Sequence, residues 1–511
     1  MLLRMLLALA AGVSLALAFE PLALWFLVPV ALAGFTLTTR GLPVLRGAVV
    51  GLVFGIGFYF TLIYWMRAVG TDAWLALASV EALFYGVLGA VAAAFGRRRW
   101  WPVTIALAWV AMETIRSSWP FSGMPWGRLA FATIDSPVAP ALPYAGATGV
   151  SFLLALAGVL LAALVVTHGR HRLVASLALT GVVAVTLLPA LVPYRSSPTE
   201  QVTVAAVQGD VPGDGSDILL DFRQVTANHV QATIELADDV AAGRSPRPDF
   251  VVWPENSTAV DPFADSETNR GIEAASQAVG VPILVGAIVD AGPRHVLNQG
   301  IVWQPGVGAG DRFTKWHPVP YGEYIPFRSV FAGTFGRLAL IPRDMMSGTR
   351  RTPLDIAGIA VANTICFDVA YDDGIYTQIS HGAQMLAVQT SNALFIHTDQ
   401  IDQQFAISRV RAVETGRTVV VAATNGVSGI IAPDGRVLDR ADIRTQQVLL
   451  ERVPLTDDVP PSVRLGQWWG RASVALTALL IVLGLVPYRR GQQRPQDAGV
   501  QARRVEAHSE L

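Results

Sequence analysis

Lysine is almost absent from this chain: Lys315 is the only lysine among 38 lysine and arginine residues. Because every other one of these residues is arginine, the single lysine indicates that position 315 needs a compact ammonium group with rotatable donors, which a guanidinium cannot replace. Cysteine is equally scarce, with Cys366 as the single example. A lone cysteine cannot form an intrachain disulfide, so its thiol is either buried and inert or reactive.

Charge is also scarce, at 15% of residues, and the formal net charge is only −1. This balance gives no sign of the basic surface that nucleic-acid binding requires, so we expect no nucleic-acid partner. The chain has no P-loop, no glycine-rich dinucleotide motif after a strand, and no Cys/His cluster at metal-ligand spacing. We therefore expect neither a metal nor a cofactor.

Hydrophobic residues make up 52% of the chain and gather at its two ends. A bilayer core requires roughly 20 apolar residues per helix. The pattern predicts seven membrane-spanning helices before a globular region and one after it, near residues 5–18, 21–39, 47–66, 74–95, 101–116, 146–167, 173–193 and 469–487. The expected division is a transmembrane bundle over 1–194, a globular domain over 195–465, a last transmembrane helix over 466–488, and a disordered cytoplasmic tail over 489–511.

Arginine is concentrated on every second connection between the predicted helices. These connections contain Arg4, Arg40 with Arg46, residues 97–99, Arg170 with Arg172, and residues 489–490. Because cytoplasmic loops carry the excess of basic residues, both termini are expected in the cytoplasm. The chain is then a multi-pass protein of the cell membrane, with its globular domain on the extracytoplasmic side. The first helix also resembles a cleavable signal peptide, and we expect it to be retained.

The region from 200 to 455 alternates short apolar runs with helical stretches, which is typical of a layered α/β domain. Predicted strands are 202–207, 250–253, 283–287, 300–303, 359–365, 385–389, 418–423, 428–432 and 448–451. Glu255 and Cys366 each follow one of these strands, and Lys315 follows the strand-like segment 312–314. Ligand sites of α/β sheets lie beyond the carboxyl ends of strands, so we expect these side chains to meet at one sheet edge.

The segment 251–255, Lys315 and the segment 364–368 together resemble the nitrilase superfamily of Glu-Lys-Cys amidases and acyltransferases. With its membrane helices, the whole chain is similar to the apolipoprotein N-acyltransferase family. Further motifs carry this resemblance: 113–116, 123–126, 315–324, 391–392, 409–417 and 424–426. The resemblance implies a nitrilase-like αββα sandwich joined to a helical transmembrane bundle.

The resemblance also implies a reaction, in which a fatty acyl chain passes from a phospholipid to the N-terminal amine of an S-diacylglyceryl-cysteine lipoprotein. Cys366 would hold the chain as a thioester in ping-pong kinetics, and Glu255 would act as the general base. Lys315 would stabilise the thiolate and the tetrahedral oxyanion. The alternative is a membrane-tethered amidase that uses the same residues and passes the acyl group to water.

Other residues have expected supporting roles. Glu323 would orient Lys315 or Glu255, and the alternative is an exposed loop acid. Trp253 is expected to pack beside the site. Glu113 is expected to pair with Arg116 one turn away, and His317 is interpreted as an ordinary polar position.

Four further positions are expected to position substrate, and three of them depart from the family pattern. Phe367 and Asp368 stand where many relatives have Tyr and Glu. The block around Asn392 lacks the usual Trp, and we expect Phe395 to take its place.

Overall fold

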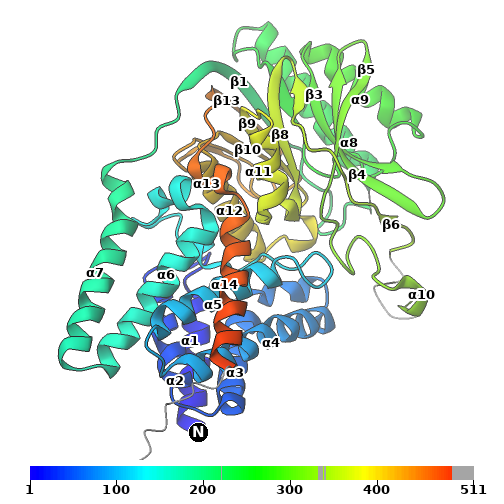
Figure 1. Cartoon of the computed structure of the whole chain (residues 1–511). Helices are drawn as coiled ribbons and strands as arrows, with labels where there is room; N and C mark the ends of the chain where they lie inside the picture. Colours follow the sequence, from blue (N-terminus) through cyan, green and yellow to red (C-terminus); the bar gives the residue numbers. More distant parts are fainter. Residues whose placement is uncertain (220, 332–337, 339–340, 486–511) are drawn as a thin grey trace, which may run out of the picture.

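Helices form one end of the molecule in this computed structural model, and an α/β part forms the other (Figure 1). The structure describes residues 1–219, 221–331, 338 and 341–485; the predicted tail at 489–511 lies outside them. The helical end comprises α1 (Leu2–Ala16), α2 (Leu27–Thr39), α3 (Val44–Leu62), α4 (Thr71–Phe95), α5 (Trp101–Arg116), α6 (Leu142–Val166), α7 (Gly169–Leu191) and α14 (Trp468–Leu485). These eight helices correspond to the eight predicted spans.

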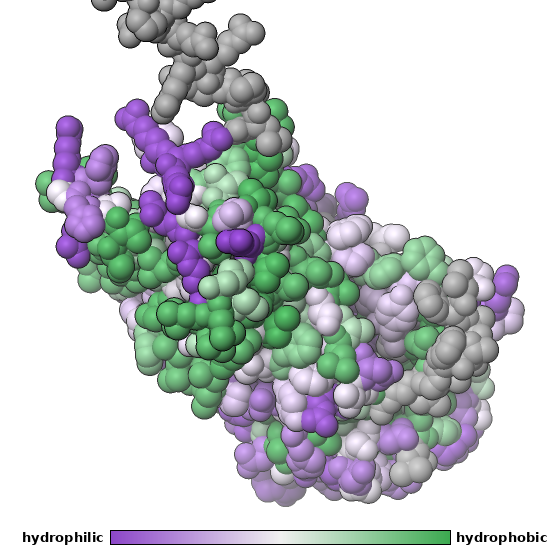
Figure 2. Space-filling model, turned by 90° about the horizontal axis from the view of Figure 1, so that it is seen from below, coloured by the Kyte–Doolittle hydropathy of each residue, from purple (hydrophilic) through white to green (hydrophobic). Residues whose placement is uncertain are grey.

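The helical end has the composition and the surface of a membrane-embedded bundle. Among the described residues, α3, α4, α7 and the segment 139–166 are long and apolar enough to cross a bilayer. The helices α1, α2 and α14 are apolar but shorter. On the face that Figure 2 shows, hydrophobic side chains cover most of the bundle, whereas the α/β part is largely polar. The chain is therefore a membrane protein.

Glycine allows α3 and α4 to pack with their backbones in contact. Gly47, Gly51 and Gly55 recur every four residues on one face of α3. A Cβ on Gly51 would lie 2.2 Å from the carbonyl oxygen of Tyr85 on α4, and a Cβ on Gly89 would lie 2.4 Å from that of Gly47. Small residues at this spacing are how membrane helices approach closely.

The buried charges of the bundle pair differently from the sequence expectation. Arg116 does not pair with Glu113; its Nη1 lies 3.4 Å from Oε2 of Glu81 on α4 and also donates to two backbone carbonyls of the loop after α5. Oε1 of Glu113 instead accepts from Trp109 Nε1 at 3.1 Å and from the Leu129 amide at 3.0 Å. The expectation considered only the local i,i+3 spacing, and contacts from another helix and a loop override it.

The α/β part contains two sheets. The first has the order β13-β1-β2-β3-β4-β5, with β6 paired to β4, and the second has the order β12-β11-β10-β9-β8-β7. The strands of the first sheet are β1 (Pro198–Gln208), β2 (Phe250–Val252), β3 (Ile283–Asp290), β4 (His295–Gln304), β5 (Gly308–Thr314), β6 (Asp344–Met345) and β13 (Gln447–Thr456). Those of the second are β7 (Leu354–Ile356), β8 (Ile359–Ile365), β9 (Met385–Thr390), β10 (Val419–Ala423), β11 (Gly429–Ile431) and β12 (Val437–Arg440).

The two sheets pack face to face between two layers of helices, which confirms the expected αββα sandwich. Val204 and Leu284 of the first sheet share a buried core with Val361 of the second. The helices α8 (Phe222–Ala241) and α9 (Ser266–Val279) cover the outer face of the first sheet. The helices α11 (Asp372–Ser380) and α12 (Gln400–Thr415) cover the second, and their core continues into the membrane helices. The short helices α10 (Arg328–Phe331) and α13 (Pro461–Leu465) complete the fold.

Every predicted strand is present, and the strands that the sequence misses lie at sheet edges. The pattern predicts only the last three residues of β5 and none of β6, β7 or β12. Most residues of β5 and β12 are exposed or half-buried, so they lack the continuous apolar run that marks a central strand.

Candidate active site

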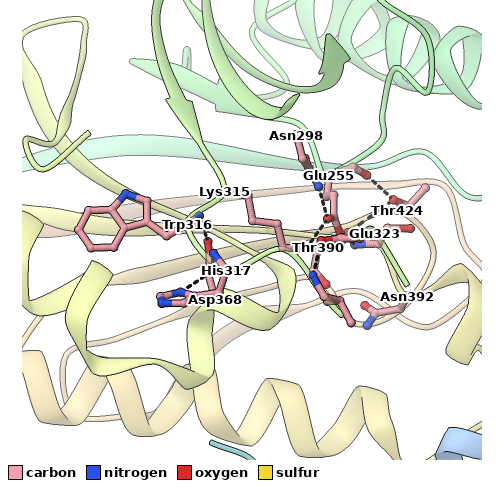
Figure 3. A network of polar contacts seen from close by, with 12 residues as sticks. Glu255, Asn298, Lys315, Trp316, His317, Glu323, Asp368, Thr390, Asn392 and Thr424 are labelled. Atoms are coloured by element: carbon pink, nitrogen blue, oxygen red, sulfur yellow. Dashed lines mark hydrogen bonds and ion pairs between the residues drawn. The ribbon is translucent and has the colours of Figure 1, made fainter. Parts of the chain in front are cut away.

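Three strand ends meet at the centre of the α/β part. Glu255 lies three residues beyond β2, Lys315 directly follows β5, and Cys366 directly follows β8. The expectation of a single sheet edge is wrong in one respect, because β2 and β5 belong to the first sheet and β8 to the second. The site therefore lies where the ends of both sheets face each other, as Figure 3 shows for the polar network around Lys315.

Lys315 is held between two carboxylates. Its Nζ lies 2.6 Å from Oε1 of Glu323 and 3.3 Å from Oε1 of Glu255, and the lysine has no exposed surface. Glu323 is not an exposed loop acid, since its side chain is only 17% exposed and its Oε2 accepts from the Val319 amide at 2.8 Å. Burial lowers the pKa of Lys315, but the charges of Glu255 and Glu323, with smaller contributions from Cys366 and Asp368, together outweigh burial and hold the pKa well above its ordinary value.

The Glu255 carboxylate is oriented by donors from both sheets. Its Oε1 accepts from Asn298 Nδ2 at 2.7 Å, and its Oε2 accepts from the Ser391 amide at 2.8 Å. The Thr424 hydroxyl donates to the Glu255 backbone carbonyl at 2.9 Å. These contacts fix the carboxylate beside Lys315, where a proton could pass between it and a neighbouring group.

Cys366 sits on a strained backbone and carries a protonated thiol. Its φ of 52° lies in the left-handed region that non-glycine residues rarely adopt. The side chain is partly accessible but enclosed on most sides, and this enclosure, followed by the charge of Glu255, raises the thiol pKa to about 12. Lys315 and a hydrogen bond with Thr390 lower this pKa by less. Because the thiol is neutral near pH 7, nucleophilic attack requires a base to remove its proton.

Asp368 ties the cysteine segment to the lysine segment. Its Oδ2 accepts from the Trp316 amide at 2.9 Å, and its Oδ1 accepts from the His317 amide at 2.9 Å. His317 Nδ1 lies 3.0 Å from the same oxygen, and His317 Nε2 lies 3.2 Å from Asp373. The imidazole also stacks on Tyr371, with ring centroids 3.7 Å apart. The sequence interpretation of His317 as an ordinary polar position is therefore wrong. His317 links the segment that follows Lys315 to the segment that follows Cys366.

The bonds of His317 predict a dependence of stability on pH. Burial lowers the His317 pKa, but hydrogen bonds and charges from Asp368 and Asp373 outweigh it and raise the pKa to about 9. A raised histidine pKa stabilises the fold fully below the unfolded value of about 6.5, and this stabilisation is lost as pH rises through 9. The temperature at which half of the wild-type protein is unfolded should therefore decrease as the pH is raised from 7 to 10.

His317→Gln is the matched variant for this prediction. It should unfold at a lower temperature than the wild type at pH 7, and the difference should shrink as pH approaches 10. An equal difference between the two proteins at both pH values would contradict the assigned charge of His317.

Phe367 and Phe395 join the α/β part to the helical end through an aromatic cluster. Phe367 stacks on Trp126, with ring centroids 6.0 Å apart, and Phe395 meets Trp65 edge-on at 5.3 Å. Trp65 and Trp126 contact each other, and both indole nitrogens donate to Oε1 of Gln403 on α12. Two of the three positions that depart from the family pattern, Phe367 and Phe395, thus contact aromatic side chains of the helical end.

The remaining predicted site residues lie near the network without entering it. Trp253 is fully buried and donates from Nε1 to the Thr233 hydroxyl at 2.9 Å. Asn392 is also buried and donates to Gln404 at 2.9 Å and to Gln400 at 3.2 Å.

The sequence did not reveal two residues that hydrogen-bond to the site: Asn298, which donates to Glu255, and Thr390, which contacts Cys366. Asn298 lies on β4 and Thr390 ends β9, and neither belongs to a motif that marks a site. Asn298 carried one usable signal, because an amide side chain within a largely apolar strand must find a hydrogen-bond partner.

Comparisons with known proteins agree with this architecture. Residues 11–160 match the family model described as the apolipoprotein N-acyltransferase N-terminal domain, and residues 203–457 match the carbon-nitrogen hydrolase model. The chain is 37% identical to the apolipoprotein N-acyltransferase of Mycolicibacterium smegmatis over 94% of this chain and 83% of that protein. It is 28% identical to the protein of the same name from Methylococcus capsulatus, over 98% of each. Among solved structures, an amidase from Nesterenkonia sp. aligns at 16% identity and a TM-score of 0.38 over 53% of this chain and 94% of the amidase.

Proposed function

Because the chain belongs to the apolipoprotein N-acyltransferase family, we propose that it transfers a fatty acyl chain from a phospholipid to the N-terminal amine of S-diacylglyceryl-cysteine lipoproteins. One observation carries the mechanism: a buried lysine lies between two carboxylates, beside the single cysteine of the chain. This arrangement supports Glu255, Lys315 and Cys366 as the catalytic residues.

In the first half of the reaction, Glu255 takes the proton of the Cys366 thiol as sulfur attacks the ester carbonyl of the phospholipid. Lys315 remains protonated and stabilises the negative charge on sulfur and then on the tetrahedral oxyanion. The backbone N–H of Phe367 supplies a second oxyanion donor, since Cys366–Ala370 form a short helical turn whose first N–H groups lack intrahelical partners. Collapse breaks the ester C–O bond, and Glu255 returns the proton to the departing lysophospholipid oxygen.

In the second half, the amine of the lipoprotein attacks the thioester carbonyl. Glu255 removes one amine proton, and collapse of the tetrahedral intermediate breaks the C–S bond. The thiolate recovers the proton from Glu255, so that the enzyme returns to its starting state with an amide as product. Glu323 positions Lys315 throughout, because it accepts the shortest hydrogen bond of the ammonium group.

The supporting residues position the reacting groups. Asp368 joins the segment that follows Lys315 to the turn that contains Cys366. Its two carboxylate oxygens accept hydrogen bonds from the amides of Trp316 and His317. Phe367 and Phe395 extend the site toward the membrane helices, where the acyl chain of the donor would lie. Trp253 and Asn392 support the strand ends on which the site is built.

We also propose the arrangement in the membrane. Residues 195–465 form the catalytic domain on the extracytoplasmic side of the cell membrane, and 1–194 with 466–488 form the bundle. The alternation of arginine-rich connections supports cytoplasmic termini. Aromatic contacts that link the bundle to the cysteine turn support a site that receives lipids from the outer leaflet.

A transfer assay tests the proposal and separates it from hydrolysis. The full chain is incubated in detergent with a radiolabelled phospholipid and a diacylglyceryl-cysteine peptide. We expect the label to move to the peptide amine, and a peptide with an acetylated amine should remain unlabelled. Release of free fatty acid at the same rate with either peptide, and no label on the amine, would contradict transfer, because water would then accept the acyl group of the phospholipid.

A further inference from the structure

A polar cleft lies between the membrane helices and the α/β part, apart from the cysteine. It has a volume of about 480 Å³ and is lined by α5, the start of α14, and the first residues of α11. This volume falls in the range of roughly 300–1,000 Å³ that small-molecule sites occupy. Glu255, Lys315 and Cys366 do not line it, whereas His317 and Tyr371 do, so the cleft adjoins the network around the proposed catalytic centre without including the three reacting groups.

Two oxygens in the cleft wall lack hydrogen-bond partners among the described residues. Glu113 is 3% exposed, and its Oε2 is buried without a partner although its Oε1 accepts two hydrogen bonds. The hydroxyl of Ser117, the residue that follows the end of α5, is likewise buried and unpartnered. Since an unsatisfied buried carboxylate oxygen is costly, this wall favours a ligand that brings a hydrogen-bond donor, above all a cationic one.

The other charges of the cleft are already matched, with one exception. Arg128 pairs with Asp372 at 2.6 Å, and His317 pairs with Asp373. Arg471 of α14 donates to Gln467 at 3.0 Å and lies over the ring of Trp468, and it forms no salt bridge with the carboxylates of the described residues. The cleft thus offers an unpartnered carboxyl oxygen deep in its wall and, on α14, a cation without a carboxylate partner.

Lipid-facing surface borders this charge pattern. Ile115 on α5 and Leu476 and Leu479 on α14 are large apolar side chains with more than a third of their surface exposed. Such a surface suits acyl chains, whereas the cleft suits a polar group that bears both charges. A molecule with both features is a zwitterionic lipid.

We propose that this cleft binds the headgroup of a phospholipid that carries a primary ammonium group. The ammonium donates to Glu113 Oε2 and to Ser117, and the phosphate meets Arg471. This site goes beyond the proposed acyl transfer, because a lipid held here does not need to reach the thiol.

Lipid retention by the Cys366→Ala protein tests the site without turnover. The full-length variant in detergent is mixed with equal amounts of phosphatidylethanolamine, phosphatidylcholine and phosphatidylglycerol, and bound lipid is counted by native mass spectrometry. We expect phosphatidylethanolamine to dominate, since choline cannot donate a hydrogen bond from nitrogen and glycerol carries no cation. Adding Glu113→Gln should lower the ratio of phosphatidylethanolamine to phosphatidylglycerol roughly tenfold, the usual scale for a lost charged hydrogen bond.

The variants are chosen so that the fold is kept. Glutamine at 113 retains an oxygen for the Trp109 and Leu129 donors, and Ser117→Val offers a second disruption of the same wall. Arg471→Gln should lower retention of all three lipids. Arg67→Gln, an exposed arginine of another connection, is the control and should change nothing.

Two results would overturn the proposal: equal retention of the three lipids by Cys366→Ala, or an unchanged lipid ratio after both Glu113→Gln and Ser117→Val. Neither result would bear on acyl transfer, which is measured separately with the intact thiol.

Discussion

Lys315→Arg is expected to lower the rate of acyl transfer by roughly 10²–10³, although the charge of the side chain is kept. The ammonium group fills a site with no exposed surface, and it contacts Glu255 and Glu323 from one nitrogen. A planar guanidinium is larger and presents its donors in a fixed fork, so it displaces one carboxylate or the attacking thiol. Single-turnover transfer from phospholipid to the peptide amine measures the effect.

The control for this variant is Arg312→Lys, the converse exchange on β5, the strand that precedes Lys315. Arg312 is exposed and its guanidinium lies over the ring of Phe263, away from the site, so its replacement should leave the rate within twofold of wild type. The thermal midpoint of each variant must stay close to the wild-type value for the comparison to stand. Wild-type turnover by Lys315→Arg would refute the role given to the lysine.

Glu255→Gln is expected to slow thioester formation by roughly 10²–10⁴, the usual contribution of a general base. The Cys366 thiol has a pKa of about 12, so almost none of it ionises at neutral pH without a base. Glutamine cannot accept the proton, and its amide nitrogen would face either Asn298 or the Ser391 amide, which are both donors. The rate of acyl incorporation into the protein at pH 7 measures this step directly.

Raising the pH offers an internal check on this variant. Because the thiol ionises more as pH rises, the Glu255→Gln rate should increase from pH 7 to 10 more steeply than the wild-type rate. Glu235→Gln, an exposed carboxylate of α8, is the matched control and should behave as the wild type. Equal pH profiles for Glu255→Gln and wild type would show that another group takes the proton.

The sequence predicted those site residues that are rare in the chain or that directly follow a predicted strand. Lys315 and Cys366 stand out because each is the only residue of its type, and Glu255 follows a continuous apolar run. The central strands were predictable for the same reason, since strands buried on both faces read as unbroken hydrophobic segments. The eight apolar helices are equally evident from composition, and the αββα layers followed from the family resemblance.

The partners of these residues could not be predicted, because they come from distant parts of the chain. Asn298 reaches Glu255 from two strands away, and Asp368 meets His317 across 51 positions of sequence. Glu81 displaces Glu113 as the partner of Arg116 because helix packing, not local spacing, brings it near. Local patterns identify which side chains are unusual, whereas tertiary packing decides what they contact.

Intact mass spectrometry of the full-length protein after incubation with phospholipid alone is the most direct test of the account. In the absence of an acceptor amine, wild type should gain the mass of one fatty acid minus one water on Cys366. Hydroxylamine should remove this adduct, addition of the peptide should discharge it, and Cys366→Ala should never acquire it. Transfer to the amine by wild type without any adduct, or an equal adduct on Cys366→Ala, would contradict a thioester at this cysteine.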